Sequence, residues 1–298
     1  MAPPLSAPNP SYRSIYRAGL LEGRAVIVTG GGSGIGRCTA HELASLGAAV
    51  ALVGRTREKL DGVCAEIAQA GGKASTHVCD IREEEAVKRA VADVLAAHGK
   101  IDGLVNNAGG QFPAPLADIS AKGWDTVVRN NLTGGFLMAR ECYTQWMAGH
   151  AAGCAIVNII ADMWMGMPGM GHSGAARAGM LNFTETAALE WAPVRVNAVA
   201  PGWIASSGMD HYGPEMRARI RGLHQHVPLG RLGTESEVSA AIVFLLSPAA
   251  AFVSGSCVRV DGAVPNARRS SPQVGNGKNE PYNGFLLAQT PKVLREDD

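Results

Sequence analysis

A glycine cluster that ends one apolar run and opens a helical pattern constrains this 298-residue chain more than any other feature. The run "RAVIVTG" leads into "TGGGSGIG", and the helical pattern "CTAHELASLG" follows. In a strand, glycine turn and helix arranged this way, the backbone can approach a pyrophosphate closely and the helix N–H groups face the anion. We therefore expect a dinucleotide site in an α/β fold, with a purely structural turn as the alternative. The expected contacts here are Thr29, Gly30, Ser33, Gly34, Ile35 and Gly36.

The alternation of strand and helix patterns continues along the chain. Six more β-branched runs follow the first: "AAVALVGR", "ASTHVCD", "IDGLVNNAG", "CAIVNII", "VRVNAVAPG" and "CVRVDGA". Longer segments with helical periodicity, such as "EEEAVKRAVADVLAAHG", separate most of them. This order predicts a Rossmann-type, doubly wound α/β domain with a seven-stranded parallel sheet covered on both faces.

The ends of the chain and one internal segment depart from this alternation of strand and helix patterns. Residues 1–19 contain four prolines and predict a flexible arm before a single domain at 20–264. Residues 203–234 are too long for an ordinary connection, so we expect a substrate loop or lid. Residues 265–298 are polar and predict a tail that lies on the surface or reaches a neighbouring subunit, with disorder as the alternative.

Composition excludes several classes of partner. The net charge of +1 gives no sign of nucleic-acid or anionic-membrane binding. No apolar run approaches the roughly 20 residues that span a bilayer, and no signal peptide opens the chain. The six cysteines form no CxxC pair, so we expect neither a zinc site nor a disulfide framework. A cytoplasmic protein is the expectation, since the terminal "VLREDD" is no peroxisomal signal.

The end of the second strand indicates the choice of dinucleotide. Sites that prefer NAD place a carboxylate there for the adenosine ribose. This chain has "VGRTREK", with Arg55 at that place and Arg57 nearby. A guanidinium pairs well with a 2′-phosphate, so the sequence favours NADPH; two merely solvated arginines are the alternative.

Further motifs occur in the order found in short-chain dehydrogenases/reductases, a family that the chain resembles from about residue 20 to 263. They are "TGGGSGIG", "CD", "NNAG", "NNL" and "PG". The resemblance implies that Asp80 binds the adenine and that Asn107, Ala108 and Gly109 shape its pocket. It also implies that Asn131 holds a structural water behind the active site. Contacts on the nicotinamide side would come from Pro201, Gly202 and Ile204.

One branch of this family is closer than the rest. The runs "NNAGGQF", "HSGAARAGM" and "FLLSPAAAFVSG" are similar to peroxisomal trans-2-enoyl-CoA reductases and to the related 2,4-dienoyl-CoA reductases. The resemblance implies NADPH-dependent reduction of a carbon–carbon double bond conjugated to an acyl-CoA thioester, by a homotetramer. One position departs from this branch, because Met180 stands where the trans-2-enoyl-CoA reductases carry a tyrosine assigned to proton relay.

The catalytic places of the wider family are altered too. Ser173 stands at the tyrosine's place, Arg177 at the lysine's, and the apolar Ile160 and Ala161 at the serine's. Ser173 and Arg177 lie four residues apart, so on a helix they share one face, and Arg177 can reach ribose hydroxyls although it cannot give up a proton. Ketone reduction needs prompt protonation of an alkoxide, which this pair supplies badly. Enoyl-thioester reduction instead needs hydrogen-bond donors at an enolate oxygen.

Two roles follow for the remaining polar residues. Gln111 is the candidate donor to the thioester oxygen, since the dienoyl-CoA reductases carry an asparagine at the matching place that binds the thioester carbonyl. The candidate proton donors are His172, which has a suitable pKa range, Asp162, Tyr212 and His211. His172 has a helix-start or core role as its alternative, and Asp162 a capping role. An acyl chain could lie against the methionine-rich segment 162–170, for which ordinary packing is the alternative.

Three functions remain open at this stage. The first is an NADPH-dependent 2-enoyl-CoA reductase, with Ser173, Arg177, Gln111, Asn131 and His172 as its candidate catalytic residues. The second is a dehydrogenase of a hydrophobic, terpenoid-like alcohol, which fits an apolar pocket but not the missing tyrosine. The third is a catalytically silent NADPH-binding protein, against which the intact glycine motif and the retained positive charge at Arg177 argue.

Overall fold

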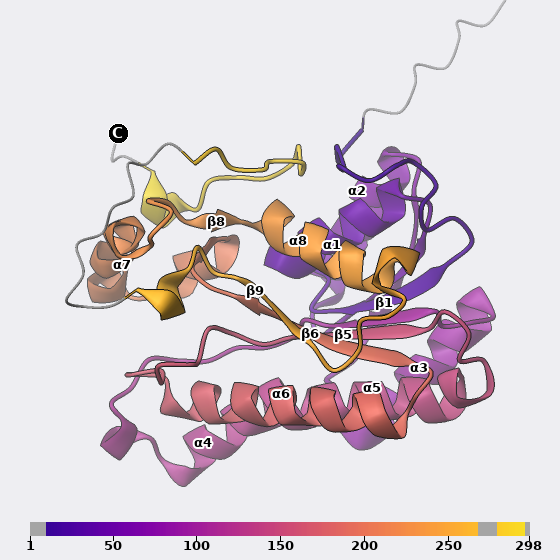
Figure 1. Ribbon diagram of the computed structural model, residues 1–298, viewed down its shortest axis with the longest axis horizontal. Helices are drawn as coiled ribbons and strands as arrows, with labels where there is room; N and C mark the ends of the chain where they lie inside the picture. Colours follow the sequence, from indigo (N-terminus) through magenta and orange to yellow (C-terminus); the bar gives the residue numbers. More distant parts are fainter. Residues whose placement is uncertain (1–9, 268–278, 296–298) are drawn as a thin grey trace, which may run out of the picture.

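The computed structural model describes residues 10–267 and 279–295 and confirms the expected fold (Figure 1). Seven parallel strands form one sheet in the order β3-β2-β1-β4-β5-β6-β9. Each strand coincides with one of the runs recognised in the sequence. The strands are β1 (Ala25–Thr29), β2 (Ala49–Gly54), β3 (Lys73–Val78), β4 (Gly103–Asn106), β5 (Ala155–Ile159), β6 (Arg195–Pro201) and β9 (Cys257–Val260).

Helices cover both faces of the sheet, as Figure 1 shows. Helices α1 (Gly34–Ser45), α2 (Arg57–Gln69) and α8 (Glu235–Leu246) pack on one face. Helices α3 (Glu84–His98), α5 (Gly134–Gln145) and α6 (Gly171–Glu190) pack on the other. The short α4 (Ala121–Val128) lies beside α6. The two apolar layers explain why the strands are nearly continuous hydrophobic runs, since both of their faces are buried.

The strand order reverses between β1 and β4, which pair side by side. In open α/β sheets, ligands bind in the crevice at the carboxyl ends of the strands at such a switch point. The glycine turn follows β1 and the "NNAG" turn follows β4, so both motifs lie at this crevice. The fold thus brings together the two turns that the sequence assigned to one dinucleotide.

The predicted lid segment, residues 203–234, forms a small unit of its own. It holds β7 (Ile204–Ala205), helix α7 (Pro214–Arg221), β8 (Gly233–Thr234) and the 3₁₀ turns Ser207–His211 and Leu223–His226. Strands β7 and β8 pair in parallel and close the base of the segment. The lid therefore leaves and re-enters the domain at neighbouring points.

The two ends of the chain meet over helix α1. Tyr12, expected in a flexible arm, is instead buried, and its hydroxyl donates to the buried carboxylate of Glu42 at 3.0 Å. An isolated antiparallel bridge pairs Tyr12 with the buried Phe285 of the C-terminal tail. The arm prediction was thus wrong for residues 10–19, because a buried carboxylate and a distant phenyl ring hold them. The remaining arm residues, 1–9, lie outside the described part of the chain.

Residues 279–295 of the tail lie over the surface of the domain, whereas residues 268–278 and 296–298 of the predicted tail lie outside the described part of the chain (Figure 1). Val293 is buried against the lid, in a cluster with Met209, Ile220 and Leu223. Within the described residues, no helix has the length and apolar character needed to cross a membrane.

Candidate functional site

The glycine turn has the geometry of an anion cradle. A Cβ at Gly36 would clash with the carbonyl oxygen of Gly30, and Gly34 has a φ of +56° that side-chain-bearing residues rarely adopt. Helix α1 starts at Gly34, carries no acidic residue in its first turn, and receives no side-chain cap from Ser33. The first N–H groups of this helix are therefore available to a phosphate.

A cleft of about 260 Å³ opens beside this turn. Its lining fits the adenosine and pyrophosphate part of a dinucleotide, since it combines the glycine cradle with polar side chains and the "NNAG" backbone. Seven of the predicted cofactor contacts line it: Gly30, Ser33, Arg55, Asp80, Asn107, Ala108 and Gly109. Lys59 and Asn130 also line the cleft, although no motif in the sequence indicated them as cofactor contacts.

Two charged groups at the cleft differ in how firmly they are held. The Asp80 carboxylate pairs with Arg82 through three hydrogen bonds of 2.5–3.1 Å, and this pairing holds the pKa of Asp80 below its usual range. Arg55 at the end of β2 is exposed and lines the cleft. The cleft thus presents a cation at the place expected to meet a 2′-phosphate.

Thr29 lies behind the cleft rather than in it. Its buried hydroxyl oxygen accepts the backbone N–H groups of Asn107 at 3.0 Å and Ala108 at 2.9 Å. The Asn107 side chain donates in return to the Thr29 carbonyl at 2.9 Å. Thr29 therefore positions the "NNAG" turn, a role that the motif alone did not reveal.

Asn131 anchors the next part of the same loop. It lies in a one-turn π-helix, Arg129–Thr133, between α4 and α5, and its side chain is buried. Its Oδ1 accepts the Gly110 N–H at 3.1 Å, and its Nδ2 donates to the Gly110 carbonyl at 2.7 Å. Single π-turns inside α-helices occur frequently at functional sites. Here the turn fixes the backbone just before Gln111.

Ser173 and Arg177 lie on the inward face of α6, as their spacing predicted. Ser173 is 1% exposed and Arg177 is 8% exposed. The Arg177 guanidinium donates to the Ile159 carbonyl at 2.6 Å, while its Nε has no partner among the described residues. Burial lowers the pKa of Arg177 to about 10. A buried cation with an unused donor fits a neighbouring group that is rich in hydroxyl or phosphate oxygens.

His172 is buried in the core, with 0% of its surface exposed. Its Nδ1 accepts the Ser173 N–H at 2.9 Å, and the Phe112 ring packs edge-on against it at 4.6 Å. Its Nε2 has no hydrogen-bond partner within the described chain. Its complete burial agrees with the core alternative for this residue.

Met180 and Ile160 are buried in one apolar cluster with Ala198 and Ala200. A Cβ at Gly135 would meet the Met180 methyl group at 2.5 Å, which shows how closely this part of the core packs. Met180 and Ile160, at the places of the relatives' tyrosine and serine, therefore supply packing and carry no exchangeable proton.

Gln111 and Tyr212 come together although a hundred residues separate them. The exposed Gln111 side chain donates from Nε2 to the Tyr212 hydroxyl at 3.4 Å. The sequence indicated each residue separately. Gln111 was predicted to donate a hydrogen bond to the thioester oxygen, and Tyr212 was a candidate proton donor in the lid. No pattern in the sequence could reveal their contact, because it depends on where the lid lies.

The other proposed groups come from the segments after β5 and β6. Asp162 follows β5, and burial together with the neighbouring Asp261 carboxylate raises its pKa. The side chain of His211 lies outside the described part of the structure. Pro201 and Ile204 are buried near the end of β6, and a Cβ at Gly202 would meet Asp261 at 2.8 Å.

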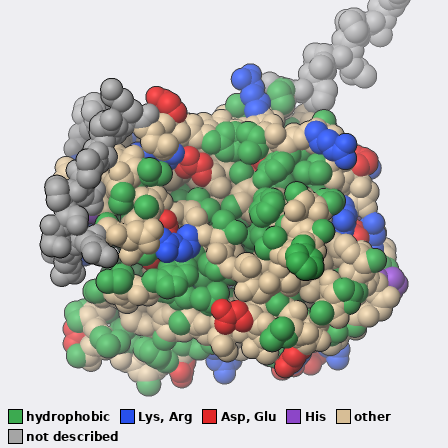
Figure 2. Space-filling model, in the orientation of Figure 1, with side chains coloured by type: hydrophobic (Ala, Val, Ile, Leu, Met, Phe, Trp, Pro, Cys, Tyr) green, Lys and Arg blue, Asp and Glu red, His purple; other side chains and the backbone are tan. Residues whose placement is uncertain are grey.

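The segment rich in methionine is only partly packed. Met167 lies against Gly174 of α6, whereas Trp164 and Met165 are exposed. Phe112, Leu116 and Trp203 add further exposed apolar surface. Hydrophobic side chains gather at the lower left of Figure 2, over the part of the molecule where Figure 1 shows α4. This surface suits an apolar ligand better than a polar one.

Comparisons with known proteins indicate the family to which this fold and this dinucleotide cleft belong. The family model described as enoyl-(acyl carrier protein) reductase matches residues 30–264. A probable 2,4-dienoyl-CoA reductase of Bacillus subtilis is 36% identical over 246 residues, which cover 81% of this chain and 96% of that protein.

Two solved structures illustrate the range of related activities. A citronellol catabolism dehydrogenase of Pseudomonas aeruginosa is 63% identical with a TM-score of 0.76, covering 85% of this chain and 99% of that one. An actinorhodin polyketide ketoreductase with NADPH is 29% identical with a TM-score of 0.77, covering 84% of this chain and all of that one, 100%. The chain is thus similar both to reductases of double bonds and to enzymes of carbonyl and alcohol chemistry.

Proposed function

This chain belongs to the short-chain dehydrogenase/reductase family, and we propose that it reduces the carbon–carbon double bond of a 2-enoyl thioester with NADPH. Membership of the family makes it an oxidoreductase that uses a nicotinamide dinucleotide. The choice of substrate and of NADPH is our proposal. We also propose that CoA carries the acyl group and that the protein assembles as a homotetramer.

The observation that carries the proposal is the pair Ser173 and Arg177 at the catalytic places. A buried serine hydroxyl is a much weaker acid than a phenol, and a guanidinium holds its proton at working pH. Neither of these two residues is an efficient proton donor to the alkoxide that carbonyl reduction would leave at their place. Reduction of a conjugated double bond avoids this demand, because the negative charge collects on the thioester oxygen as an enolate.

Stabilisation of that enolate needs aimed donors. Gln111 offers an amide N–H₂ group at the mouth of the site, and one such donor typically contributes about 3 kcal/mol to the transition state. Arg177 adds a positive charge in a buried position, from which water is largely excluded. When bound, NADPH supplies the hydride, while the residues of the chain bind and orient the substrate and stabilise the charge.

The preference for NADPH is supported by Arg55. It is an exposed cation that lines the adenosine part of the cleft, where a carboxylate would favour NAD. A guanidinium offers a 2′-phosphate two parallel hydrogen bonds.

The test is a comparison of substrates with the purified full chain. Oxidation of NADPH in the presence of crotonyl-CoA or a longer 2-enoyl-CoA, with none in the presence of a 3-oxoacyl-CoA, would support the proposal. Tight NADPH binding without oxidation at any chain length would contradict it and would support a catalytically silent protein.

A second candidate is dehydrogenation of a terpenoid alcohol. It is favoured by the 63% identity to a protein described as a citronellol catabolism dehydrogenase and by the apolar surface beside the site. Formation of NADPH from NADP and citronellol, with no activity on enoyl thioesters, would support this candidate instead. Activity on a methyl-branched 2-enoyl-CoA would reconcile the first proposal with a role in terpenoid breakdown.

A further inference from the structure

The loop residues that flank Gln111 contact the stretch of α6 that holds the altered catalytic pair. On one side, a Cβ at Gly109 would lie 2.5 Å from Nη2 of Arg177. On the other, the Phe112 ring packs against His172, the residue before Ser173. Because Gly109 and Phe112 both contact this stretch of α6, the exposed Gln111 between them lies close to it.

The lid supplies the partner of Gln111. Tyr212 follows the 3₁₀ turn Ser207–His211, and its hydroxyl accepts the Gln111 amide at 3.4 Å. The Tyr212 side chain is half-buried, so its hydroxyl keeps access to solvent. A hydrogen bond of this length is long, as catalytic contacts often are before the substrate tightens them.

Several bonds fix the backbone that presents Tyr212. Arg217 donates to the Tyr212 carbonyl at 2.8 Å and to the Asp210 carbonyl at 2.7 Å. The Asp210 carboxylate accepts the N–H of Val293 at 3.0 Å, so the C-terminal tail holds the same turn. The phenol is therefore positioned by the lid and the tail together.

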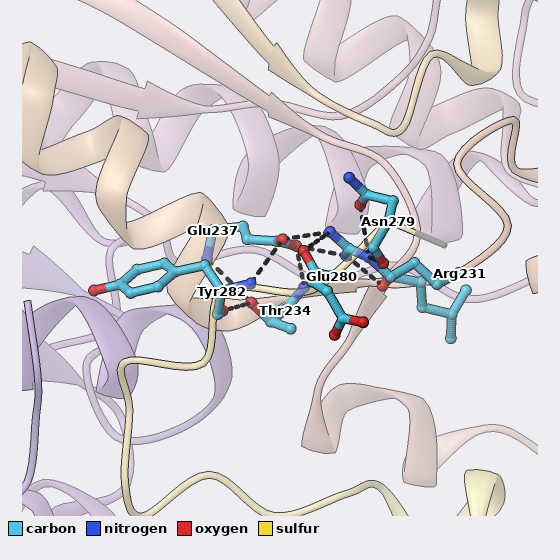
Figure 3. A network of polar contacts seen from close by, with 7 residues as sticks. Arg231, Thr234, Glu237, Asn279, Glu280 and Tyr282 are labelled. Carbon is cyan, nitrogen blue, oxygen red and sulfur yellow. Dashed lines mark hydrogen bonds and ion pairs between the residues drawn. The ribbon is translucent and has the colours of Figure 1, made fainter. Parts of the chain in front are cut away.

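The base of the lid is tied to the tail in the same way, as Figure 3 shows. Arg231 pairs with Glu237 at 2.6 and 2.9 Å and donates to the Asn279 side chain at 2.9 Å. Thr234 donates to the Tyr282 carbonyl at 2.7 Å, and the Tyr282 N–H donates back to Glu237 at 3.2 Å. The C-terminal end of the lid, residues 231–234, is thus tied to the tail, and β7 at the other end of the lid pairs with β8.

We propose that Tyr212 is the proton donor of this enzyme. Located in the lid, it replaces the tyrosine acid that is absent at positions 173 and 180 of helix α6. This inference rests on the proposed enoyl-thioester reduction. Once Cβ has received the hydride, the electron pair of the double bond resides on the thioester oxygen, where the Gln111 amide stabilises it. The pair then returns to form a bond between Cα and the Tyr212 proton, and the phenolate takes a proton from water.

Three residues of helix α6 are less well placed for this step. Ser173 and His172 are almost completely buried, and Met180 has no exchangeable proton. Tyr212 instead has an exchangeable proton and access to solvent. Its hydroxyl also accepts a hydrogen bond from Gln111, the proposed donor to the thioester oxygen. General acid catalysis by such a group typically contributes about 10²–10⁴-fold to the rate.

The test compares Tyr212→Phe with Tyr143→Phe, whose ring stacks on Trp191 away from the site. The unaltered chain should reduce crotonyl-CoA in D₂O and place deuterium on one face of Cα. In Tyr212→Phe we expect kcat to fall about 100-fold or more and the labelling to become mixed, since water then approaches from either side. The NADPH Kd and the circular dichroism spectrum should stay unchanged, and Tyr143→Phe should behave as the unaltered chain does.

The possible outcomes distinguish the proton-donor role of Tyr212 from the proposed reduction of enoyl thioesters. If the unaltered chain is active and Tyr212→Phe keeps its kcat and facial selectivity, the proton-donor role is wrong while the proposed function stands. An effect on KM alone would also overturn it, since the tyrosine would then serve only in binding. If the unaltered chain reduces no enoyl thioester, the proposed function fails and this inference falls with it.

Discussion

The guanidinium of Arg177 lies directly against Gly109, so that a Cβ at residue 109 would come within 2.5 Å of Nη2. The same Cβ would lie 2.7 Å from Oδ1 of Asn131. One glycine of the "NNAG" turn is therefore the point at which the dinucleotide loop, the buried cation of α6 and the π-turn asparagine meet. This close approach explains why the loop needs no side chain here.

Replacement of Gly109 should disturb both partners at once. Gly109→Ala is expected to lower the free energy of unfolding by about 1–3 kcal/mol through overpacking, and to reduce turnover by displacing Arg177. Gly149→Ala is the matched control, because within the described chain a Cβ there would meet nothing within 4 Å apart from its immediate neighbours along the chain. Urea unfolding of the two variants measures the difference; equal midpoints would contradict the contact.

The dinucleotide preference can be tested at Arg55. Arg55→Ala should weaken NADPH binding tenfold or more and leave NADH binding nearly unchanged, because a charge-assisted hydrogen bond contributes roughly 1.5–3 kcal/mol. Fluorescence titration with both reduced dinucleotides gives the two Kd values. The exposed Arg57, which is not among the residues lining the cleft, provides the control. Equal weakening of both dinucleotides by Arg55→Ala would show that the preference has another origin.

Glu235 should make stability depend on pH. Burial raises the pKa of its carboxyl from 4.5 to about 7, an effect that Arg37 partly offsets. Between these pH values the unfolded chain has lost this proton while the folded chain retains it, so stability falls as pH rises. The shift corresponds to ~3 kcal/mol, at about 1.4 kcal/mol per pH unit.

The variant Glu235→Gln removes this titration. It should be more stable than the unaltered chain at pH 8, and the difference should shrink as the pH falls toward 4.5. Thermal unfolding across this range measures it, with the exposed Glu58→Gln as control. A gap between Glu235→Gln and the unaltered chain that does not change with pH would contradict the assignment.

Phe285 should contribute more to stability than its place near the end of the chain suggests. Its ring is 3% exposed, packs against Tyr12 and His41, and lies under the Arg37 guanidinium. Phe285→Ala is expected to cost about 3–5 kcal/mol. Leu286→Ala, at a side chain that is 42% exposed, should change little. If both variants unfold at the temperature of the unaltered chain, the tail does not stabilise the domain.

The fold was predictable because its signals are local. Each strand is a short β-branched run, each major helix has its own periodicity, and the glycine turn lies where one meets the other. The burial of Tyr12 was not predictable, since it depends on Glu42 and on Phe285 at the far end of the chain. No local pattern distinguishes a proline-rich arm that docks from one that does not.

In the candidate site, too, the local motifs were predictable and the side-chain contacts were not. Its backbone motifs predicted the cleft, and seven of the predicted contacts line it. The orientation of side chains was beyond the sequence: His172 faces the core, Thr29 supports a turn, and Gln111 meets Tyr212 across the lid. These outcomes depend on tertiary packing, which periodicity does not encode.

The central claim is that a conjugated double bond, and not a carbonyl group, receives the hydride. The most direct measurement uses NADPH deuterated at the transferred position, together with crotonyl-CoA and the full chain. We predict a saturated butyryl-CoA product that carries the deuterium on Cβ. Absence of such a product, together with deuterium on the carbinol carbon of an alcohol formed from an aldehyde or ketone, would contradict this account.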